Sequence, residues 1–112
     1  VGIRSISRGI GKTLFYEMTL AEGKIYQFSG TCRVINNGFT NTFEAVDAEK
    51  QVLSGQTKIL GNSAVDDFSF SFITSAAGTY FLKWYEAGGN DRNAAYNMQV
   101  TEVGTAIKVT FN

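Results

Sequence analysis

The chain has 112 residues, of which 44% are hydrophobic and 13% aromatic, and its 10 acidic and 10 basic side chains cancel. This length and apolar content indicate one domain with one core and argue against a disordered protein. The zero net charge argues against a nucleic-acid partner. No apolar run approaches membrane-spanning length, so membrane insertion is not expected.

Residues 1–13 are predicted to form a basic, glycine-containing arm ahead of a single domain at 14–112. Each glycine in the arm would cost a helix about 1 kcal/mol, so we expect an extended conformation. The end of the arm, Arg8–Thr13, resembles a phosphate-binding loop, but Ile6 stands where that pattern requires its first glycine. The arm is instead a candidate for docking on a partner, through Ile3, Arg4, Ile6, Arg8 and Ile10.

From residue 14 onward, apolar residues recur at every second position, the period of strands with one buried and one exposed face. The expected strands are 12–20, 25–35, 39–46, 51–53, 56–60, 68–73, 80–87, 96–101 and 107–111. Turns or loops are expected at 21–24, 36–38, 47–50, 54–55, 61–66, 75–78, 88–93 and 103–105. About eight short strands without a helical period predict an all-β, antiparallel two-sheet β-sandwich with a jelly-roll-like arrangement.

The alternation also predicts which side chains fill the core. Three sets of alternating residues, one from each of three strands, are expected to face inward: Phe68, Phe70 and Phe72; Tyr80, Leu82 and Trp84; Tyr96, Met98 and Val100. Gly30, in the middle of a strand, predicts a bulge or a close backbone approach. The chain has no proline, so protection of the sheet edges is expected from lysines: Lys24, Lys58, Lys83 and Lys108.

Candidates for catalysis are few. The chain has no histidine, which removes the commonest general base and metal ligand. Its single cysteine, Cys32, cannot form an internal disulfide and has the inward parity of a buried filler. Adjacent Asp66 and Asp67 would point to opposite faces of a strand. We therefore assign no catalytic residue and no cofactor, and expect a protein that is not an enzyme.

A calcium site is the remaining question for the acidic residues. Asp47, Glu49, Asp66, Asp67 and Asp91 fall in or beside predicted loops, and hard cations prefer clustered oxygens. No D-x-D-x-D-G run is present. Solvated turn residues explain these acids more simply, so no metal site is assigned.

The outward side of the 80–87 strand carries the candidate binding site. Phe81 and Tyr85 flank Lys83 there, and exposed aromatic residues of this kind stack on sugar rings or cover a partner surface. The following loop adds Asn90, Asp91 and Arg92, which are suited to hydrogen-bonding hydroxyls or a partner's backbone. The alternative is that the arm, or a bulge that shifts the register, covers the two aromatic rings.

Several short motifs resemble the bacterial pre-peptidase C-terminal domain and related jelly-roll binding modules. They are an F-x-F strand (Phe68, Phe70), the Ala77–Tyr80 segment AGTY, the Y-x-M-x-V strand (Tyr96, Met98, Val100), the Leu20–Phe28 hairpin and the 43–53 strand–turn–strand. The resemblance implies a non-catalytic appendage of an exported protein that binds glycans or fibrous proteins. A chain with a basic, glycine-rich arm also resembles small virion proteins such as tail-fibre heads and capsid decoration subunits.

Two functional hypotheses follow. The first is a non-catalytic, extracellular binding or adhesion module that recognises a glycan or surface polymer through Phe81, Lys83, Tyr85 and the Asn90–Arg92 loop. The alternative is a structural subunit of a virion, whose arm docks on a virion neighbour or on another copy in a homo-oligomer.

Overall fold

The computed structural model describes residues 2–3, 6–8, 13–34, 39–61, 63–87 and 93–106. The described residues form strands, turns and bends, with no helix, and therefore none that could span a membrane. The strands are β1 (Gly2–Ile3), β2 (Ile6–Arg8), β3 (Thr13–Leu20), β4 (Lys24–Val34), β5 (Phe39–Val46), β6 (Val52–Leu60), β7 (Val65–Ile73), β8 (Gly78–Ala87) and β9 (Asn93–Thr105). Arg4, Ile10, Asn90, Asp91, Arg92, the 36–38 turn, and Lys108 with its predicted 107–111 strand lie outside the described residues.

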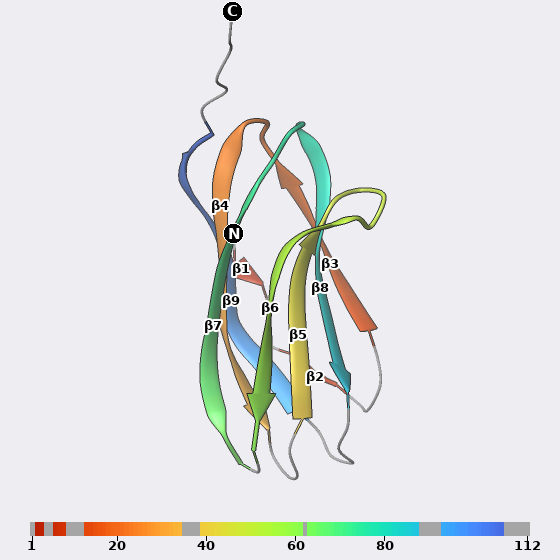
Figure 1. Ribbon diagram of the computed structural model, residues 1–112, viewed down its shortest axis with the longest axis vertical. Helices are drawn as coiled ribbons and strands as arrows, with labels where there is room; N and C mark the ends of the chain where they lie inside the picture. The colour runs from red at the N-terminus through yellow and green to blue at the C-terminus, as the bar shows by residue number, and fades with distance from the viewer. Residues whose placement is uncertain are drawn as a thin grey trace, which may run out of the picture.

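The strands build two sheets that pack face to face (Figure 1). Sheet A has the order β1-β9-β4-β7, with β2 also paired to β9, and sheet B has the order β3-β8-β5-β6. All the pairings are antiparallel. The chain passes repeatedly from one sheet to the other, as at β3 to β4 and at β7 to β8. This arrangement confirms the predicted all-β, two-sheet sandwich.

The core lies between the sheets and is dominated by aromatic rings. Phe43 of β5 stacks on Phe68 of β7, with ring centroids 3.8 Å apart and an interplanar angle of 9°. Trp84 of β8 lies opposite Phe43 in sheet B, with ring centroids 5.8 Å apart. Because β5 and β7 belong to different sheets, the Phe43–Phe68 stack joins the two layers directly. Burial confirms the inward parity predicted for β8, namely Tyr80, Leu82 and Trp84.

Two predicted turns are wrong, because the residues pair within strands. Ser54 and Gly55 continue β6, where they lie opposite Ala45 and Glu44 of β5. A Cβ on Gly55 would lie 2.7 Å from the carbonyl oxygen of Phe43, so this glycine permits a close approach of two strands. The sequence 103–105 likewise continues β9 and pairs with the start of β4.

The predicted 61–66 loop is also shorter than expected. Strand β7 begins at Val65, so Asp66 and Asp67 are strand residues that pair with Cys32 and Thr31 of β4. Pairing with β4 extends β7 toward its N-terminal end, beyond the residues in which apolar and polar side chains alternate in the sequence.

A bulge in β9 overturns the predicted inward position of Tyr96. Ala95 and Met98 are both buried although they are three residues apart, at 0% and 1% exposure, so the alternation changes phase between them. The change occurs at Asn97, which has a φ of 53°. Tyr96 therefore pairs with Thr31 on the outer face of sheet A. Met98 and Val100 face the core as predicted.

Gly30 of β4 lies opposite this bulge, as its position in the sequence predicted. The β4–β9 register shifts between Ser29 and Thr31. A Cβ on Gly30 would lie 2.8 Å from the ring of Phe68 and 2.9 Å from Met98. The close approach predicted for this glycine is therefore confirmed, and it lets core side chains from two neighbouring strands pack over the backbone.

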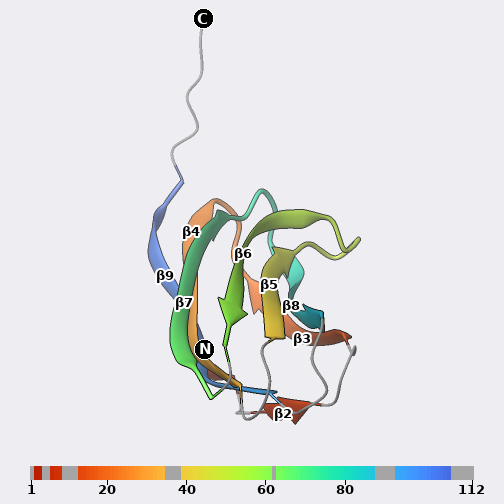
Figure 2. The same ribbon diagram turned by 60° about the horizontal axis from the view of Figure 1, so that its bottom comes forward.

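The arm is extended where it is described, and it adds two short strands to sheet A. Gly2 and Ile3 pair with Gln99 and Met98 of β9, and β2 pairs with residues 93–95 of the same strand. Figure 2 shows β2 at the lower end of the sandwich. These strands extend sheet A, whereas the outward residues of β8 belong to sheet B.

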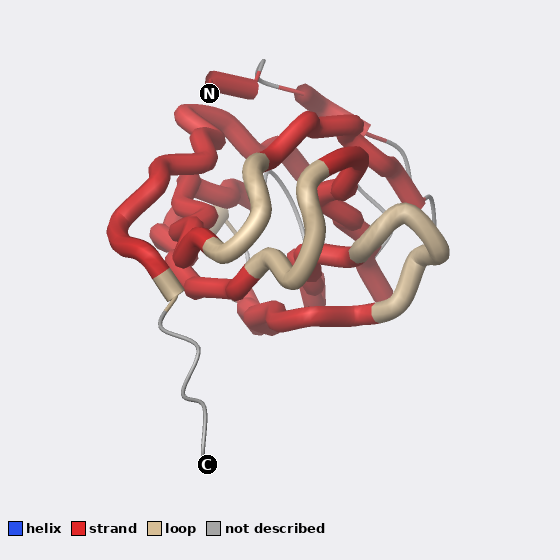
Figure 3. The backbone as a smooth tube through the Cα atoms, turned by 90° about the horizontal axis from the view of Figure 1, so that it is seen from above, coloured by secondary structure: helices blue, strands red, loops and turns tan. Residues whose placement is uncertain are grey.

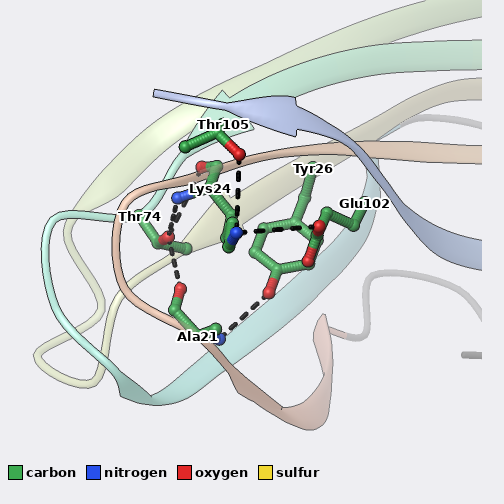
Figure 4. Close-up of polar contacts among 6 residues, drawn as sticks. All are labelled: Ala21, Lys24, Tyr26, Thr74, Glu102 and Thr105. Atoms are coloured by element: carbon green, nitrogen blue, oxygen red, sulfur yellow. Dashed lines mark hydrogen bonds and ion pairs between the residues drawn. The ribbon is translucent and has the colours of Figure 1, made fainter. Parts of the chain in front are cut away.

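At the end of the sandwich opposite β2, buried Thr74 forms hydrogen bonds with the β3–β4 turn (Figure 4). Its Oγ1 donates to the carbonyl oxygen of Ala21 at 2.6 Å and accepts from the backbone N–H of Lys24 at 3.1 Å. Tyr26 Oη accepts from the N–H of Ala21 at 3.0 Å. The two bonds of Thr74 connect the β3–β4 turn to the segment between β7 and β8, whereas the bond of Tyr26 lies within the β3–β4 hairpin.

Candidate functional site

The outward side of β8 presents three predicted site residues in one line. Phe81, Lys83 and Tyr85 are each half-buried, and they alternate with fully buried Leu82 and Trp84. We call these three residues the β8 face. Because β8 lies between β3 and β5 in sheet B, the β8 face occupies the interior of a sheet surface.

Cross-strand neighbours define what surrounds the β8 face. Each of its residues lies between one residue of β3 and one of β5: Glu17 and Val46 beside Phe81, Phe15 and Glu44 beside Lys83, Thr13 and Thr42 beside Tyr85. Val46 and Thr42 are buried, so the accessible surroundings of the β8 face come from Thr13, Phe15, Glu17 and, in part, Glu44.

Phe81 is packed against Phe15 and Lys50, two residues that the sequence did not single out. The rings of Phe81 and Phe15 meet edge to face, with centroids 6.1 Å apart at 83°. The Nζ of Lys50 lies 4.2 Å from the centroid of Phe81 and 5.2 Å from that of Phe15. This geometry is that of a cation–π contact shared by two rings.

The turn after β5 places Lys50 over the rings. Asp47 Oδ1 accepts hydrogen bonds from the backbone N–H groups of Glu49 and Gln51, each at 2.9 Å. Lys50 occupies the left-handed region at a φ of 66°. The outward parity of Phe15 was visible in the sequence, but nothing there indicated that Lys50 would reach it.

Lys83 links the second aromatic ring to a carboxylate. Its Nζ lies 4.9 Å from the ring centroid of Tyr85 and 3.7 Å from Glu44 Oε1. The side chains of Lys83 and Glu44 are 30% and 18% exposed, so both groups can still contact a ligand. A donor, Lys83, and an acceptor, Glu44, therefore lie on this face between Phe81 and Tyr85. The aromatic rings of the β8 face are thus partly covered. Among the described residues, Phe15 and Lys50 pack against Phe81, and Lys83 packs against Tyr85.

The acidic residues considered for calcium are largely engaged within the protein. Asp66 Oδ2 lies 3.1 Å from Lys58 Nζ, and its Oδ1 accepts the N–H of Asp67 at 2.9 Å. The hydrogen bond from Lys58 is the main reason that the pKa of Asp66 is lowered. Asp67 in turn accepts from Thr31 at 2.8 Å. Across the part of the chain that is described, no group of three or more His, Cys, Asp or Glu could hold a metal ion.

Figure 3 shows loops and turns at one end of the sandwich. A small pocket of about 260 Å³ opens among the residues of two of these connections. It lies between the β5–β6 turn and the β7–β8 segment, and its lining includes Asp47, Glu49, Thr79 and Tyr80. Tyr80 Oη donates to the carbonyl oxygen of Ala76 at 2.6 Å. That bond holds the rim of the pocket in place.

Cys32 is buried at 0% exposure, as its parity predicted. Its Sγ lies 3.5 Å from the carbonyl oxygen of Asp66 and donates to it. Burial is the main cause that raises the pKa of this thiol to about 11. A protonated, buried thiol is a poor nucleophile.

Comparison with solved structures finds several that are similar to this chain. One match carries the description "CBM4 structure and function", with a TM-score of 0.68, 12% identity, and coverage of 81% of this chain and 61% of the other. Two others are the VP2 subviral particle of infectious bursal disease virus (TM-score 0.49, 9% identity, 87% and 29% coverage) and the structure of its Gt strain (0.48, 12%, 86% and 29%). This chain thus spans less than two thirds of the length of each.

No protein-family model matches the chain, and no curated protein matches its sequence. The structural match with a TM-score of 0.68 shows that the jelly-roll-like fold is shared with a carbohydrate-binding module. The resemblance to the pre-peptidase C-terminal domain stays a prediction.

Proposed function

We propose that this domain is a non-catalytic module that binds a glycan or a similar surface polymer on the β8 face. The observation that carries the proposal is the line of Phe81, Lys83 and Tyr85 along one interior strand, with two rings separated by a cation. Aromatic rings contact the apolar faces of sugars, while polar groups beside them fix orientation through hydrogen bonds.

The spacing of the rings favours a polymer over a single sugar. Phe81 and Tyr85 are four residues apart on one strand, so they are separated by about 13 Å at roughly 3.3 Å per residue. A ligand that contacts both rings must extend along β8. Lys83 would donate to its hydroxyls and Glu44 would accept from them, midway between the rings. The Asn90–Arg92 loop, which follows β8 in sequence, would extend the same site.

The likeness to a carbohydrate-binding module supports this class of function at the level of the fold. At 12% identity, the residues of the site have to be argued from this chain alone. An extracellular or virion location and the absence of a cofactor belong to the same proposal.

Glycan-array binding of Phe81→Ala and Tyr85→Ala variants tests the site. We expect both to lose binding, because each removes one stacking ring. The matched control is Ile73→Ala on sheet A, which removes a residue of 56% exposure away from the β8 face and should leave binding unchanged. Circular dichroism checks that all variants stay folded. Full binding by a folded Phe81→Ala/Tyr85→Ala double variant would refute the site.

The alternative function, a virion assembly subunit docked by its arm, also stays a prediction. In this chain β1 and β2 pair with β9 of the same chain. Light scattering on the intact protein and on a variant lacking residues 1–8 tests it. Assembly that is lost with the arm would favour this alternative, and an unchanged mass would remove it.

A further inference from the structure

The ring of Phe81 is covered by the side chain of Lys50. The Nζ of Lys50 lies over this ring, 4.2 Å from its centroid, and over the ring of Phe15 at 5.2 Å. Atoms in van der Waals contact lie roughly 3.5–4 Å apart, so the ammonium occupies the layer in which a sugar would contact the ring. A sugar and Lys50 therefore cannot share this face of Phe81.

The backbone beneath Lys50 is fixed by the turn between β5 and β6. The N–H of Asp47 donates to the carbonyl oxygen of Gln51, and the N–H of Lys50 donates to that of Asp47, each at 3.0 Å. The carboxylate of Asp47 accepts two further N–H groups of the turn. Lys50 holds a φ of 66°, which is uncommon for residues other than glycine. The turn thus fixes where the lysine side chain begins.

The side chain of Lys50 can nevertheless leave the ring while the turn stays as it is. Lys50 is exposed, so its flexible four-carbon stem can swing into solvent. Exposed side chains change rotamer within picoseconds to nanoseconds, and a cation–π contact at an exposed site is weak. The cover over Phe81 is therefore easily opened.

The lysine beside Tyr85 is held more firmly. Lys83 Nζ lies 4.9 Å from the centroid of Tyr85, and Glu44 Oε1 lies 3.7 Å from the same ammonium. Lys83 and Lys24 lie on the interior strands β8 and β4, so the prediction that they protect sheet edges is wrong. The ion pair with Glu44 instead keeps Lys83 in the middle of the β8 face. The movable cover belongs to the Phe81 end.

We propose that Lys50 is a lid over Phe81, and that a glycan must displace this lid to contact the ring. The inference rests on the proposed function, because a lid over Phe81 matters only if the ring binds a ligand. Displacement breaks the contact between the ammonium and the rings of Phe81 and Phe15. The affinity for the glycan is therefore lower than an uncovered ring would give.

Calorimetric titration with two linear neutral oligosaccharides, cellohexaose and chitohexaose, tests the competition. Lys50→Ala should bind about two- to fivefold more tightly than the unmodified protein, the factor that corresponds to a contact of roughly 0.5–1 kcal/mol. Lys50→Gly, which suits the positive φ of this position, should show the same gain. The matched control is Lys24→Ala on sheet A, which removes the same charge away from the β8 face and should leave the affinity unchanged.

Failure of the lid and failure of the glycan site give different results. Unchanged or weaker binding by both Lys50 variants, with binding abolished in Phe81→Ala/Tyr85→Ala, would overturn the lid and leave the glycan site standing. Full binding by the folded Phe81→Ala/Tyr85→Ala variant would refute the site itself.

Hydroxyl-radical footprinting, read by mass spectrometry, tests the lid without a glycan. These radicals modify aromatic side chains according to their exposure. Phe81 should be modified faster in Lys50→Ala than in the unmodified protein, whereas Tyr85, which contacts Lys83, should react at the same rate in both. Equal modification of Phe81 in the two proteins would show that Lys50 does not cover the ring, and would overturn the proposal.

Discussion

The indole Nε1 of Trp84 donates a hydrogen bond to Oδ1 of Asn41 at 3.0 Å, inside the core where both side chains are fully buried. Trp84 belongs to β8 and Asn41 to the neighbouring β5. A large ring that must bury its N–H needs a partner of this kind.

Asn41→Leu should destabilise the fold, because it leaves the indole N–H without this acceptor. We expect a loss of about 1–3 kcal/mol in the free energy of unfolding, measured by urea denaturation. The same substitution in a Trp84→Phe background should cost less, because the donor is already gone. Equal costs in the two backgrounds would show that the hydrogen bond is not what makes Asn41 important.

Gly30→Ala should destabilise the protein by overpacking. The added Cβ would lie 2.8 Å from the ring of Phe68 and 2.9 Å from Met98, and such crowding in a packed core costs roughly 1–3 kcal/mol. Gly61→Ala is the control, since a Cβ there has no neighbour within 4 Å. Thermal unfolding of both variants should show a lower midpoint only for the change at Gly30.

Thr74→Val should destabilise the end of the sandwich at which the β3–β4 turn meets the β7–β8 segment. The substitution keeps the shape of the side chain but removes the bonds to the carbonyl of Ala21 and the N–H of Lys24. Leaving such groups unpaired costs about 1–3 kcal/mol. Thr101→Val, on the exposed side of β9, should change the free energy of unfolding by less than about 0.5 kcal/mol. Similar urea midpoints for the two variants would count against the role given to Thr74.

The thiol of Cys32 should resist alkylation in the folded protein. Burial raises its pKa from 9.0 to about 11, so iodoacetamide at pH 8 should label it only after urea is added. Rapid labelling of the folded chain would contradict this assignment.

The same pKa shift makes stability depend on pH in alkali. Because the folded state holds the proton more tightly than the unfolded state, the contribution of Cys32 is complete below pH 9 and declines between pH 9 and about 11. Comparison of urea midpoints with a Cys32→Ala variant isolates this contribution, since other titrations remain. An identical decline in the two proteins would assign the pH dependence to other groups.

Much of the architecture could be predicted from the period-two pattern. The pattern gives the inward residues of β8 and the antiparallel sandwich because each of those strands buries one face throughout its length. It fails at Ser54–Gly55, where residues typical of turns serve a close approach between β5 and β6. Local composition alone does not distinguish these two uses of glycine.

The candidate site was only partly predictable for a related reason. Phe81, Lys83 and Tyr85 share one strand, so their common face follows from alternation. Lys50 comes from a different segment, and its position over Phe81 depends on the turn held by Asp47. Contacts between segments distant in sequence are set by the assembled sandwich.

The bulge at Asn97 gives β9 one residue more than its pairing with β4 requires. Without Asn97, Ala95, Tyr96, Met98 and Gln99 would alternate inward and outward without interruption, matching their observed burial. A chain lacking this residue would therefore keep every side chain on its present side while straightening the strand. The arm, however, pairs with β9 on both sides of the bulge in one register, with Gly2 opposite Gln99 and Ile6 opposite Ala95. Removal of Asn97 would therefore leave the arm one residue too long between β1 and β2, so the extra residue of β9 is matched to the arm.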